Sequence, residues 1–447
     1  MDIVQGEETH TIDVRPLASS IEETMSQHLF MSPNCCIFKT PVALYRQNPK
    51  AYIPDAFSIG PFHHGNQFLK GTEIIKAKYL KNLLEKSESP NTMLADMINY
   101  IKASERKFRE CYAGWLNYSS EEFVKILVID SCFIIELFFR NAEKRGVEDD
   151  PILRTPSMLE VLDHDLILLE NQVPWMILER LFRMTRHNRC HGETLIQLAI
   201  EFFRNIFPFT ISDPPQAIKH IPDLFKKLMV SSMGVEEFGS NMPYRWEPVP
   251  SATRLLEAGI KFRQSKSANM FDIKFRNGIL EIPQIRIHEI TETFIKNLIS
   301  FEQCYPKGDD TITSYAILLD NLIDTTKDVE ILRERNILSI CLNPEDAVQF
   351  FNKLYHTTCV KSFHYLDLCR DLNKHCQKRL PRWRALLVRR ISASDEISDE
   401  ERTTNSNGRQ SGKFGAVSAR NIRSPAKDDG PFDINSGEDI YARRNTA

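Results

Sequence analysis

The sequence predicts a mainly α-helical fold: a multi-helix globular body with one small β-hairpin near residues 271–282 and a disordered C-terminal tail. Apolar residues recur at the spacing of one helical face in most segments before residue 390. Glycine is scarce (17 residues) and phenylalanine abundant (27), which favours bulky helix–helix packing. Residues 391–447 are polar and poor in apolar side chains, so they cannot bury enough surface to offset the entropy lost on ordering.

The composition is that of a soluble globular protein: 447 residues, 42% hydrophobic and 26% charged. The net charge of −3 gives no general attraction to nucleic acid, so no nucleic-acid partner is expected. The acidic, polar N-terminus does not read as a secretory signal, and no stretch approaches roughly 18 uninterrupted apolar residues. Ten cysteines without a Cys-x-x-Cys pair favour buried thiols in a reducing compartment. We therefore expect a chain that is cytoplasmic or peripheral to the plasma membrane.

Three regions are predicted along the chain: a flexible lead over 1–30 with one short helix, a helical region over 35–390 with a sub-boundary near 232–250, and the disordered tail over 391–447. In the first half, apolar spacing and capping residues predict the helices in order. They are Thr72–Glu85, a helix capped by Thr92 whose stripe extends to Phe108, Phe123 to about Arg140 behind a Ser119/Glu122 capping box, one capped by Ser157, one with Pro174 in its first turn, about Glu193–Phe207, and Ile221–Met229.

The second half begins with an irregular stretch and contains the predicted hairpin. Asn277-Gly278 between two short β-prone runs is a strong signal for a two-residue turn. The predicted elements are helix Ser251–Ala258 stopped by Gly259, strands Phe271–Phe275 and Ile279–Ile282, helices at about Glu289–Gln303, Thr313–Leu322 and Pro344–Leu354 (capped by Asn343), and a basic helix from about Tyr365 to Arg389 with a break at Pro381.

Three segments set polar groups directly against apolar residues: Ile53–Gly65, Asp165–Trp175 and Asn297–Pro306. Polar groups held that close to a core must be hydrogen-bonded, because an unpaired one costs a few kcal/mol. Each segment is therefore part of a structural polar network or part of a site.

These segments, in the same order, carry a family resemblance. The chain resembles the plant-specific proteins classed as domain of unknown function 247, also called uncharacterised protein family 0481, from about Cys36 to about Trp383. The motifs that carry the resemblance are Val42–Gly65, Lys76 and Tyr79, Phe123–Leu137, Leu168–Pro174 (LLENQVP), Ile282-Pro283, Thr291, Asn297-Leu298 and Glu302-Gln303.

The resemblance implies an α-helical plant protein, usually tethered by one C-terminal membrane helix. Some grass relatives are associated with pollen–stigma self-incompatibility, which suggests recognition or signalling, and the family offers no established catalytic residues. This chain departs from the pattern after Trp383, because the polar tail stands where relatives have an apolar anchor. The departure affects the expected membrane attachment and not the expected fold.

The motif residues have two interpretations. In the first, they form an internal network of carboxylates and amides, with Lys76 as one candidate partner of Glu170. In the second, the protein is an uncharacterised enzyme whose catalytic groups are Glu170, Glu302 and His63 or His64. That interpretation requires these side chains to converge on one cleft. The structural or binding candidates are Ser58, Gly60, Pro61, His63, His64, Lys76, Asp130, Glu170, Asn171, Gln172, Asn297, Glu302 and Gln303.

No metal or cofactor is expected. The group His187/Cys190/His191 lacks a fourth ligand at finger spacing. The same low expectation of a metal applies to the group His364/Cys369/His375/Cys376. Walker, dinucleotide-glycine and Gly-x-Ser-x-Gly patterns are absent.

The basic stretch Lys374–Arg390 is either a solvated helix face or a contact with anionic lipid headgroups. The lipid-contact candidates are Lys378, Arg379, Arg382, Arg384, Arg389 and Arg390. The leading hypothesis remains a non-enzymatic interaction or signalling protein with an unknown protein partner; the alternatives are the enzyme and peripheral membrane association.

Overall fold

The computed structural model describes residues 14–26, 31–143, 150, 152–186, 192–206, 213–231, 247–267, 269–287, 289–340, 342–355 and 358–378. The chain divides into two units, Met1–Ala385 and Leu386–Ala447, and all described residues belong to the first. The predicted disordered tail therefore lies outside the described residues.

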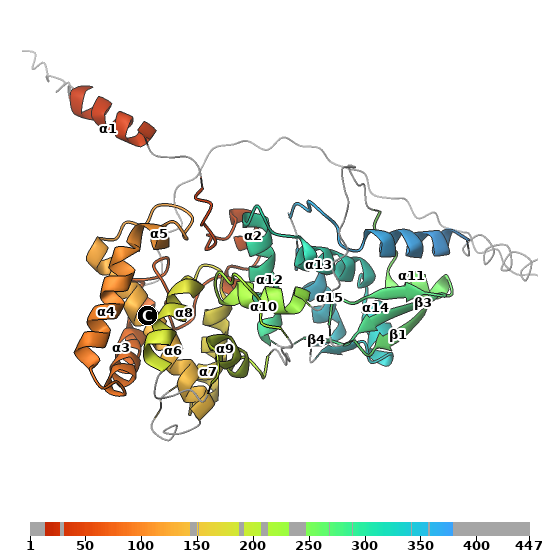
Figure 1. Ribbon diagram of the computed structural model, residues 1–447. Coiled ribbons are helices and arrows are strands. Elements are labelled where there is room, and N and C mark those ends of the chain that lie inside the picture. The colour runs from red at the N-terminus through yellow and green to blue at the C-terminus, as the bar shows by residue number, and fades with distance from the viewer. Residues whose placement is uncertain are drawn as a thin grey trace, which may run out of the picture. The chain divides into compact units, whose positions relative to one another are not determined.

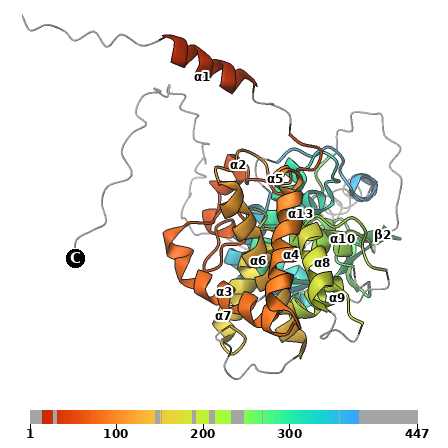
Figure 2. The ribbon, with the colours of Figure 1, turned by 60° about the vertical axis from the view of Figure 1, so that its left-hand side comes forward.

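Helix α6, Ser120–Glu143, is buried along most of its length. Its predicted capping box is confirmed: the Glu122 backbone N–H donates to Ser119 Oγ at 3.2 Å, and the Ser119 N–H donates to Glu122 Oε2 at 3.1 Å. A helix that is apolar nearly all round belongs inside a core. Figures 1 and 2 show its neighbours, which are α3 (Lys70–Glu85), α4 (Pro90–Ala103), α8 (Trp175–Thr185) and α9 (Leu195–Phe202).

Aromatic contacts join these helices, as the abundance of phenylalanine predicts. Phe133 lies 5.1 Å from Tyr79 of α3, and Phe139 stacks on Phe182 of α8 at 5.5 Å, ring centroid to centroid. The remaining helices are α1 (Val14–Ser26), α2 (Val42–Tyr45), η1 (Pro49–Ala51), η2 (Gln67–Leu69), α5 (Glu105–Arg109), α7 (Pro156–Ile167), α10 (Ile221–Ser231), α11 (Ala252–Glu257), α12 (Glu289–Cys304), α13 (Thr311–Leu322), α14 (Thr326–Glu334) and α15 (Pro344–Asn352). Residues 366–378 are also helical.

The predicted hairpin is confirmed as β2 (Lys274–Arg276) and β3 (Ile279–Pro283), which pair antiparallel. Asn277 and Gly278 have φ of 52° and 76°, as a turn with two left-handed residues requires. The hairpin is only part of a sheet, because β1 (Lys261–Ser265) pairs parallel with β3. A second parallel pair joins β4 (Ile285–Ile287) to β5 (Leu338–Ile340). Parallel partners lie far apart in sequence, so no local turn signal announces them.

Several helix starts differ from the predicted caps. Helix α4 begins at Pro90 behind Ser89 instead of behind Thr92, and Phe108 belongs to the separate α5. Helix α7 begins at Pro156, so Ser157 lies inside its first turn. In these two helices proline occupies the first helical position, where its missing N–H has no intrahelical acceptor. Pro174 instead stands at the N-cap, one residue before α8.

One continuous cluster of buried apolar side chains extends from Cys36 to Cys376, on both sides of the predicted sub-boundary near 232–250. A small satellite cluster is formed by Cys35, Phe38, Leu169 and Phe301. Within the described part of the chain, no helix combines the length and apolar character needed to cross a bilayer.

Gly60 determines how closely the first motif approaches the LLENQVP segment. Its φ is +74°, and a Cβ placed there would lie 2.2 Å from the carbonyl oxygen of Gln172. Both a left-handed backbone and a main-chain clash therefore exclude other residues.

We expect Gly60→Ala to lower the free energy of unfolding by about 3 kcal/mol or more, because strain and overpacking act together. Urea unfolding measures the change. Gly71→Ala is the matched control: Gly71 lies in α3, where an added Cβ meets nothing within 4 Å. The control should be neutral or stabilise by up to about 1 kcal/mol. Equal effects of the two changes would contradict this account.

Candidate functional site

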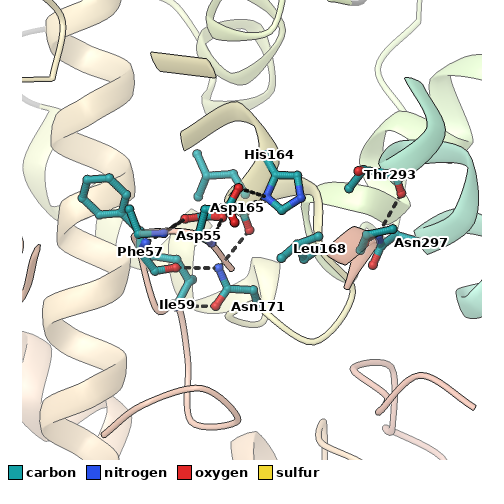
Figure 3. Close-up of polar contacts among 12 residues, drawn as sticks. Asp55, Phe57, Ile59, His164, Asp165, Leu168, Asn171, Thr293 and Asn297 are labelled. Carbon is teal, nitrogen blue, oxygen red and sulfur yellow. Dashed lines mark hydrogen bonds and ion pairs between the residues drawn. The ribbon is translucent and has the colours of Figure 1, made fainter. Parts of the chain in front are cut away.

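Asp165, at the end of α7, binds the first of the three polar segments, Ile53–Gly65 (the first motif), from the side of the core (Figure 3). Its side chain is fully buried, and its two oxygens accept the backbone N–H groups of Asp55, Ala56 and Phe57 at 2.7, 2.9 and 2.7 Å. A buried carboxylate needs such donors, because an unpaired charge there is strongly unfavourable. One side chain thereby determines the path of three successive residues.

Asn171 joins the same motif to the LLENQVP segment (Figure 3). Its Oδ1 accepts the Ile59 N–H at 2.7 Å, and its Nδ2 donates to the carbonyls of Phe57 and Asp165 at 2.8 and 2.9 Å. The Asp165 carbonyl lies in the last turn of α7, where intrahelical donors are lacking. The amide therefore caps a helix and fastens a loop at once.

Gln172 links two helix ends. Its Nε2 donates to the carbonyls of Leu166 and Leu168 at 2.7 and 2.8 Å, and its Oε1 accepts the N–H of Ile221, the first residue of α10, at 3.2 Å. The Gln172 backbone carbonyl accepts the Tyr112 hydroxyl at 3.1 Å. These bonds satisfy groups that α7 and α10 leave unpaired.

Asn297 of α12 brings the third motif into the network. Its Oδ1 accepts the Leu169 N–H at 2.8 Å, and its Nδ2 donates to the carbonyls of Ala51 and Thr293 at 2.7 and 2.8 Å. This amide therefore joins the third segment to the second and to the backbone just before the first. The side chain is completely buried.

A buried ion pair lies below the turn at Gly60. Lys76 Nζ lies 2.5 Å from Asp130 Oδ1 and 2.7 Å from Glu73 Oε1, and it donates to the Ser58 carbonyl at 2.7 Å. Asp130 Oδ2 accepts the Gly60 N–H at 2.8 Å. Burial by itself lowers the pKa of Lys76, but the charges of Asp130 and Glu73 outweigh it and raise that pKa. The lysine is therefore charged, paired and out of contact with solvent.

Glu170 has other partners than the one the sequence suggested. Lys76 binds Asp130, so its predicted pairing with Glu170 is wrong. Glu170 Oε1 accepts the Thr40 N–H at 2.8 Å, and burial raises the Glu170 pKa. His63 Nε2 lies 3.8 Å from Glu170 Oε2. Burial lowers the pKa of His63 to about 4, so this ring is neutral at pH 7 and the contact is not an ion pair.

Glu302 caps α13 from inside the core. Its oxygens accept the backbone N–H groups of residues 312 and 313 at 3.0 and 2.8 Å, and Lys226 Nζ of α10 lies 2.9 Å away. Burial raises the Glu302 pKa against the pull of Lys226. Gln303 points elsewhere and exchanges two hydrogen bonds with the backbone of Cys359, at 3.0 and 2.9 Å.

The outer end of the first motif borders two cavities. Tyr118 donates to the carbonyls of Pro61 and His64 at 3.0 and 3.1 Å, which anchors this end. His64 and Glu73 line both cavities, of about 160 and 460 Å³, whereas Glu170, His63 and Glu302 line neither. The other lining residues are Ser58, Gly65, Asn66, Leu69 and Lys70 in the smaller cavity, and Ile74, Ala77, Glu122, Lys125, Ile126, Ile129 and Asp130 in the larger.

Asp55, His164 and Asp165 are the group of described residues in which three ligand atoms lie within 4.8 Å of one another. His164 Nδ1 contacts Asp165 Oδ1 at 3.0 Å, while both oxygens of Asp165 already accept backbone N–H groups. Burial lowers the pKa of His164, but the hydrogen bond and charge of Asp165 outweigh it and raise the pKa. The oxygens of Asp165 are therefore already engaged by His164 and by the loop backbone. His187, Cys190 and His191 lie outside the described residues.

Sequence reasoning missed His220, which is fully buried. Its Nε2 lies 3.0 Å from the Cys36 carbonyl, and its Nδ1 accepts the Asp223 N–H at 3.2 Å in the first turn of α10. This pair of contacts requires a neutral ring that donates through Nε2. Burial lowers the His220 pKa to about 4. A polar residue immediately before an apolar helix was the available signal.

We expect Lys76→Met to lower the free energy of unfolding by about 3–5 kcal/mol, because it leaves the Asp130 charge buried without its cation. The double variant Lys76→Met/Asp130→Asn should lose less than Lys76→Met alone, since the amide oxygen still accepts the Gly60 N–H without a charge. Lys81→Met on the same helix is the control, because Lys81 is exposed and pairs with Glu85 at the surface. Urea unfolding of all three variants tests this prediction. A double variant that is less stable than Lys76→Met alone would refute it.

Acid should destabilise the fold through His220. The folded-state pKa of about 4 lies below the value of about 6.5 in the unfolded chain, so stability is lost as pH falls from 6.5 towards 4. The loss from this ring is about 2 kcal/mol between pH 7.5 and pH 5. His220→Gln should be less stable at pH 7.5 but flatter with pH. Parallel stability curves for the two proteins from pH 7.5 to pH 5 would contradict this assignment.

Comparison with known proteins places the chain in a family without assigning an activity. Residues 37–395 match the family DUF247, described as "Plant protein of unknown function". The chain is 28% identical over 329 residues to the UPF0481 protein At3g47200 of Arabidopsis thaliana, covering 68% of each. It is 21% identical over 491 aligned positions to the putative UPF0481 protein At3g02645 of the same plant, covering 87% of this chain and 91% of that protein. No solved structure matches. Because the family match spans most of the sequence, the chain belongs to the DUF247 family of plant proteins of unknown function.

Proposed function

We propose that the chain is a non-enzymatic interaction protein of a recognition or signalling type, which binds a protein partner through the outer end of the loop Phe57–Gly65 and the adjoining faces of α3 and α6. The observation that carries the proposal is the use of the motif side chains. The carboxylates and amides of Asp165, Asn171 and Gln172 bond backbone groups inside the protein. They hold the loop in place and leave its outer end for contact.

Apolar side chains stand exposed around this outer end. Phe68 and Ile74 are 95 and 77% exposed. Ile74 lines the larger cavity, and Phe68 precedes Leu69, which lines the smaller one. Large apolar side chains next to a hollow are typical of interaction surfaces. A loop already ordered by internal bonds loses little entropy on binding.

Charged side chains of both signs line the cavities: Lys70 and Glu73 in the smaller one, and Glu73, Glu122, Lys125 and Asp130 in the larger. Polar groups on the partner can therefore be paired beside the apolar side chains.

The enzyme alternative finds less support in this geometry. Glu302 is buried and bonded to Lys226 and to the start of α13. Glu170 and His63 approach each other, but neither lines a cavity beside the loop. A general base must reach the proton it removes within hydrogen-bonding distance, which Glu302 could do only by leaving its present partners.

The proposal also places the chain in the cytoplasm or at the surface of the plasma membrane. The cysteines among the described residues are free, six of them buried, which suits a reducing compartment. Contact with anionic lipid through the basic stretch stays a prediction. Lys378 is exposed, and Arg379, Arg382, Arg384, Arg389 and Arg390 lie outside the described residues.

Ile74→Asp tests the surface. Ile74 is exposed, so the change should leave the fold intact while it places a charge on the apolar wall. Proximity labelling in plant cells, followed by titration of a purified partner, should show at least a tenfold loss of affinity, or about 1.4 kcal/mol. Leu256→Asp on α11, also at an exposed apolar residue, is the matched control and should bind normally. Equal binding by the two variants, or a measurable turnover by the purified chain without any specific partner, would overturn the proposal.

A further inference from the structure

Four thiols from three distant segments gather behind the start of the first motif. Cys35 lies near Cys111 and Cys304, and Cys36 lies beside Cys111. All four are free. The pair Cys36 and Cys111 differs from the others because the backbone itself places it.

The backbone holds Cys36 and Cys111 opposite each other. Ile37 and Tyr112 form a parallel bridge, in which the Ile37 N–H donates to the Cys111 carbonyl at 2.9 Å and the Ala113 N–H donates to the Ile37 carbonyl at 2.8 Å. Cys36 and Cys111 are the next residues in this register. Paired strands lie about 4.8 Å apart, inside the range of Cα separations that a disulfide spans. Opposed residues in parallel strands also point to the same face.

The side chains at this point are fixed in the core. Cys111 Sγ lies 3.5 Å from the Lys107 carbonyl, to which the thiol donates. The neighbouring Cys111 thiol and burial raise the pKa of Cys36 well above its ordinary value, and burial raises the pKa of Cys35 and of Cys132 to about 12, so these thiols react slowly.

We propose that Cys36 and Cys111 are a redox pair that hydrogen peroxide joins as a disulfide. One thiolate of the pair attacks one oxygen of hydrogen peroxide, the O–O bond breaks, and a cysteine sulfenic acid and hydroxide form. The second sulfur then attacks the sulfenic sulfur, the S–O bond breaks, and the thiol proton leaves with the hydroxyl group as water. Two thiols and one peroxide thereby give one disulfide and two waters.

Burial sets which reagents react. Cys36 and Cys111 are 5% and 1% exposed, whereas Cys359 lies on the surface. A bulky maleimide modifies Cys359 first, while peroxide is small enough to enter when the segment opens locally. The pair is therefore a slow, small-oxidant sensor.

The bond would act on the network that holds the first motif. The Cys36 carbonyl accepts a hydrogen bond from the His220 ring, and the backbone N–H of Thr40, four residues later, donates to Glu170. Tyr112, next to Cys111, donates to the carbonyl of Gln172. A disulfide ties these contacts together and removes freedom from the unfolded chain, so oxidation stabilises the fold. This inference stands without the proposed function, because it concerns the purified chain alone.

The experiment treats the full-length chain with graded hydrogen peroxide, blocks the remaining thiols with a maleimide, and maps disulfides by mass spectrometry without reduction. Because Cys35 and Cys36 lie on the same tryptic peptide, variants make the assignment. Cys35→Ser is the matched control and should keep the crosslink to Cys111. Cys36→Ser and Cys111→Ser should each lose it.

A second measurement does not depend on any variant. Peroxide-treated wild-type chain should unfold at a higher urea concentration than the reduced chain, and the gain should disappear on reduction. The proposal is overturned if the Cys35→Ser variant loses the crosslink, if Cys36→Ser or Cys111→Ser keeps it, or if peroxide oxidises only Cys359.

Discussion

The arrangement of this protein depends on buried carboxylate and amide side chains that bond backbone groups of distant segments. Asp165 holds three successive N–H groups of the first motif, Asn297 joins the third motif to the second, and Glu302 caps a helix beside it. A buried backbone group left unpaired costs about 1–3 kcal/mol, so each of these bonds excludes alternative loop paths. The aromatic core supplies cohesion, but it does not choose among loop conformations; the polar side chains do.

The inner and outer halves of the first motif differ in the same way. In the inner half, the N–H groups of Phe57, Ile59 and Gly60 already have buried side-chain acceptors. The outer half, at His63–Gly65, reaches the cavities and the exposed apolar side chains. Rigid support behind an open apolar surface suits recognition better than proton transfer, which needs titratable groups that substrate can reach.

The N-terminal segment Cys35–Thr40 is the point at which the polar network and the thiols meet. The Cys36 carbonyl contacts the His220 ring, the Thr40 N–H donates to Glu170, and Ile37 forms a β-bridge with Tyr112, next to Cys111. Acid protonates a ring that the fold needs neutral, and the disulfide that we propose would tie this segment to Cys111.

The amino-acid sequence alone determined the local features of this protein: the Ser119/Glu122 capping box, the Asn277-Gly278 turn and the Asn343 cap of α15 all form as predicted. It also determined the family, through several motifs in one order. Only the tertiary structure decided which groups meet, pairing Lys76 with Asp130 instead of Glu170, adding β1 to the hairpin, and placing His220 against Cys36. Capping and turn signals act within a few residues and so can be read along the chain. The choice of a buried partner depends on the path of the whole backbone, because any unpaired carboxylate accepts any cation or N–H that the packing brings to it.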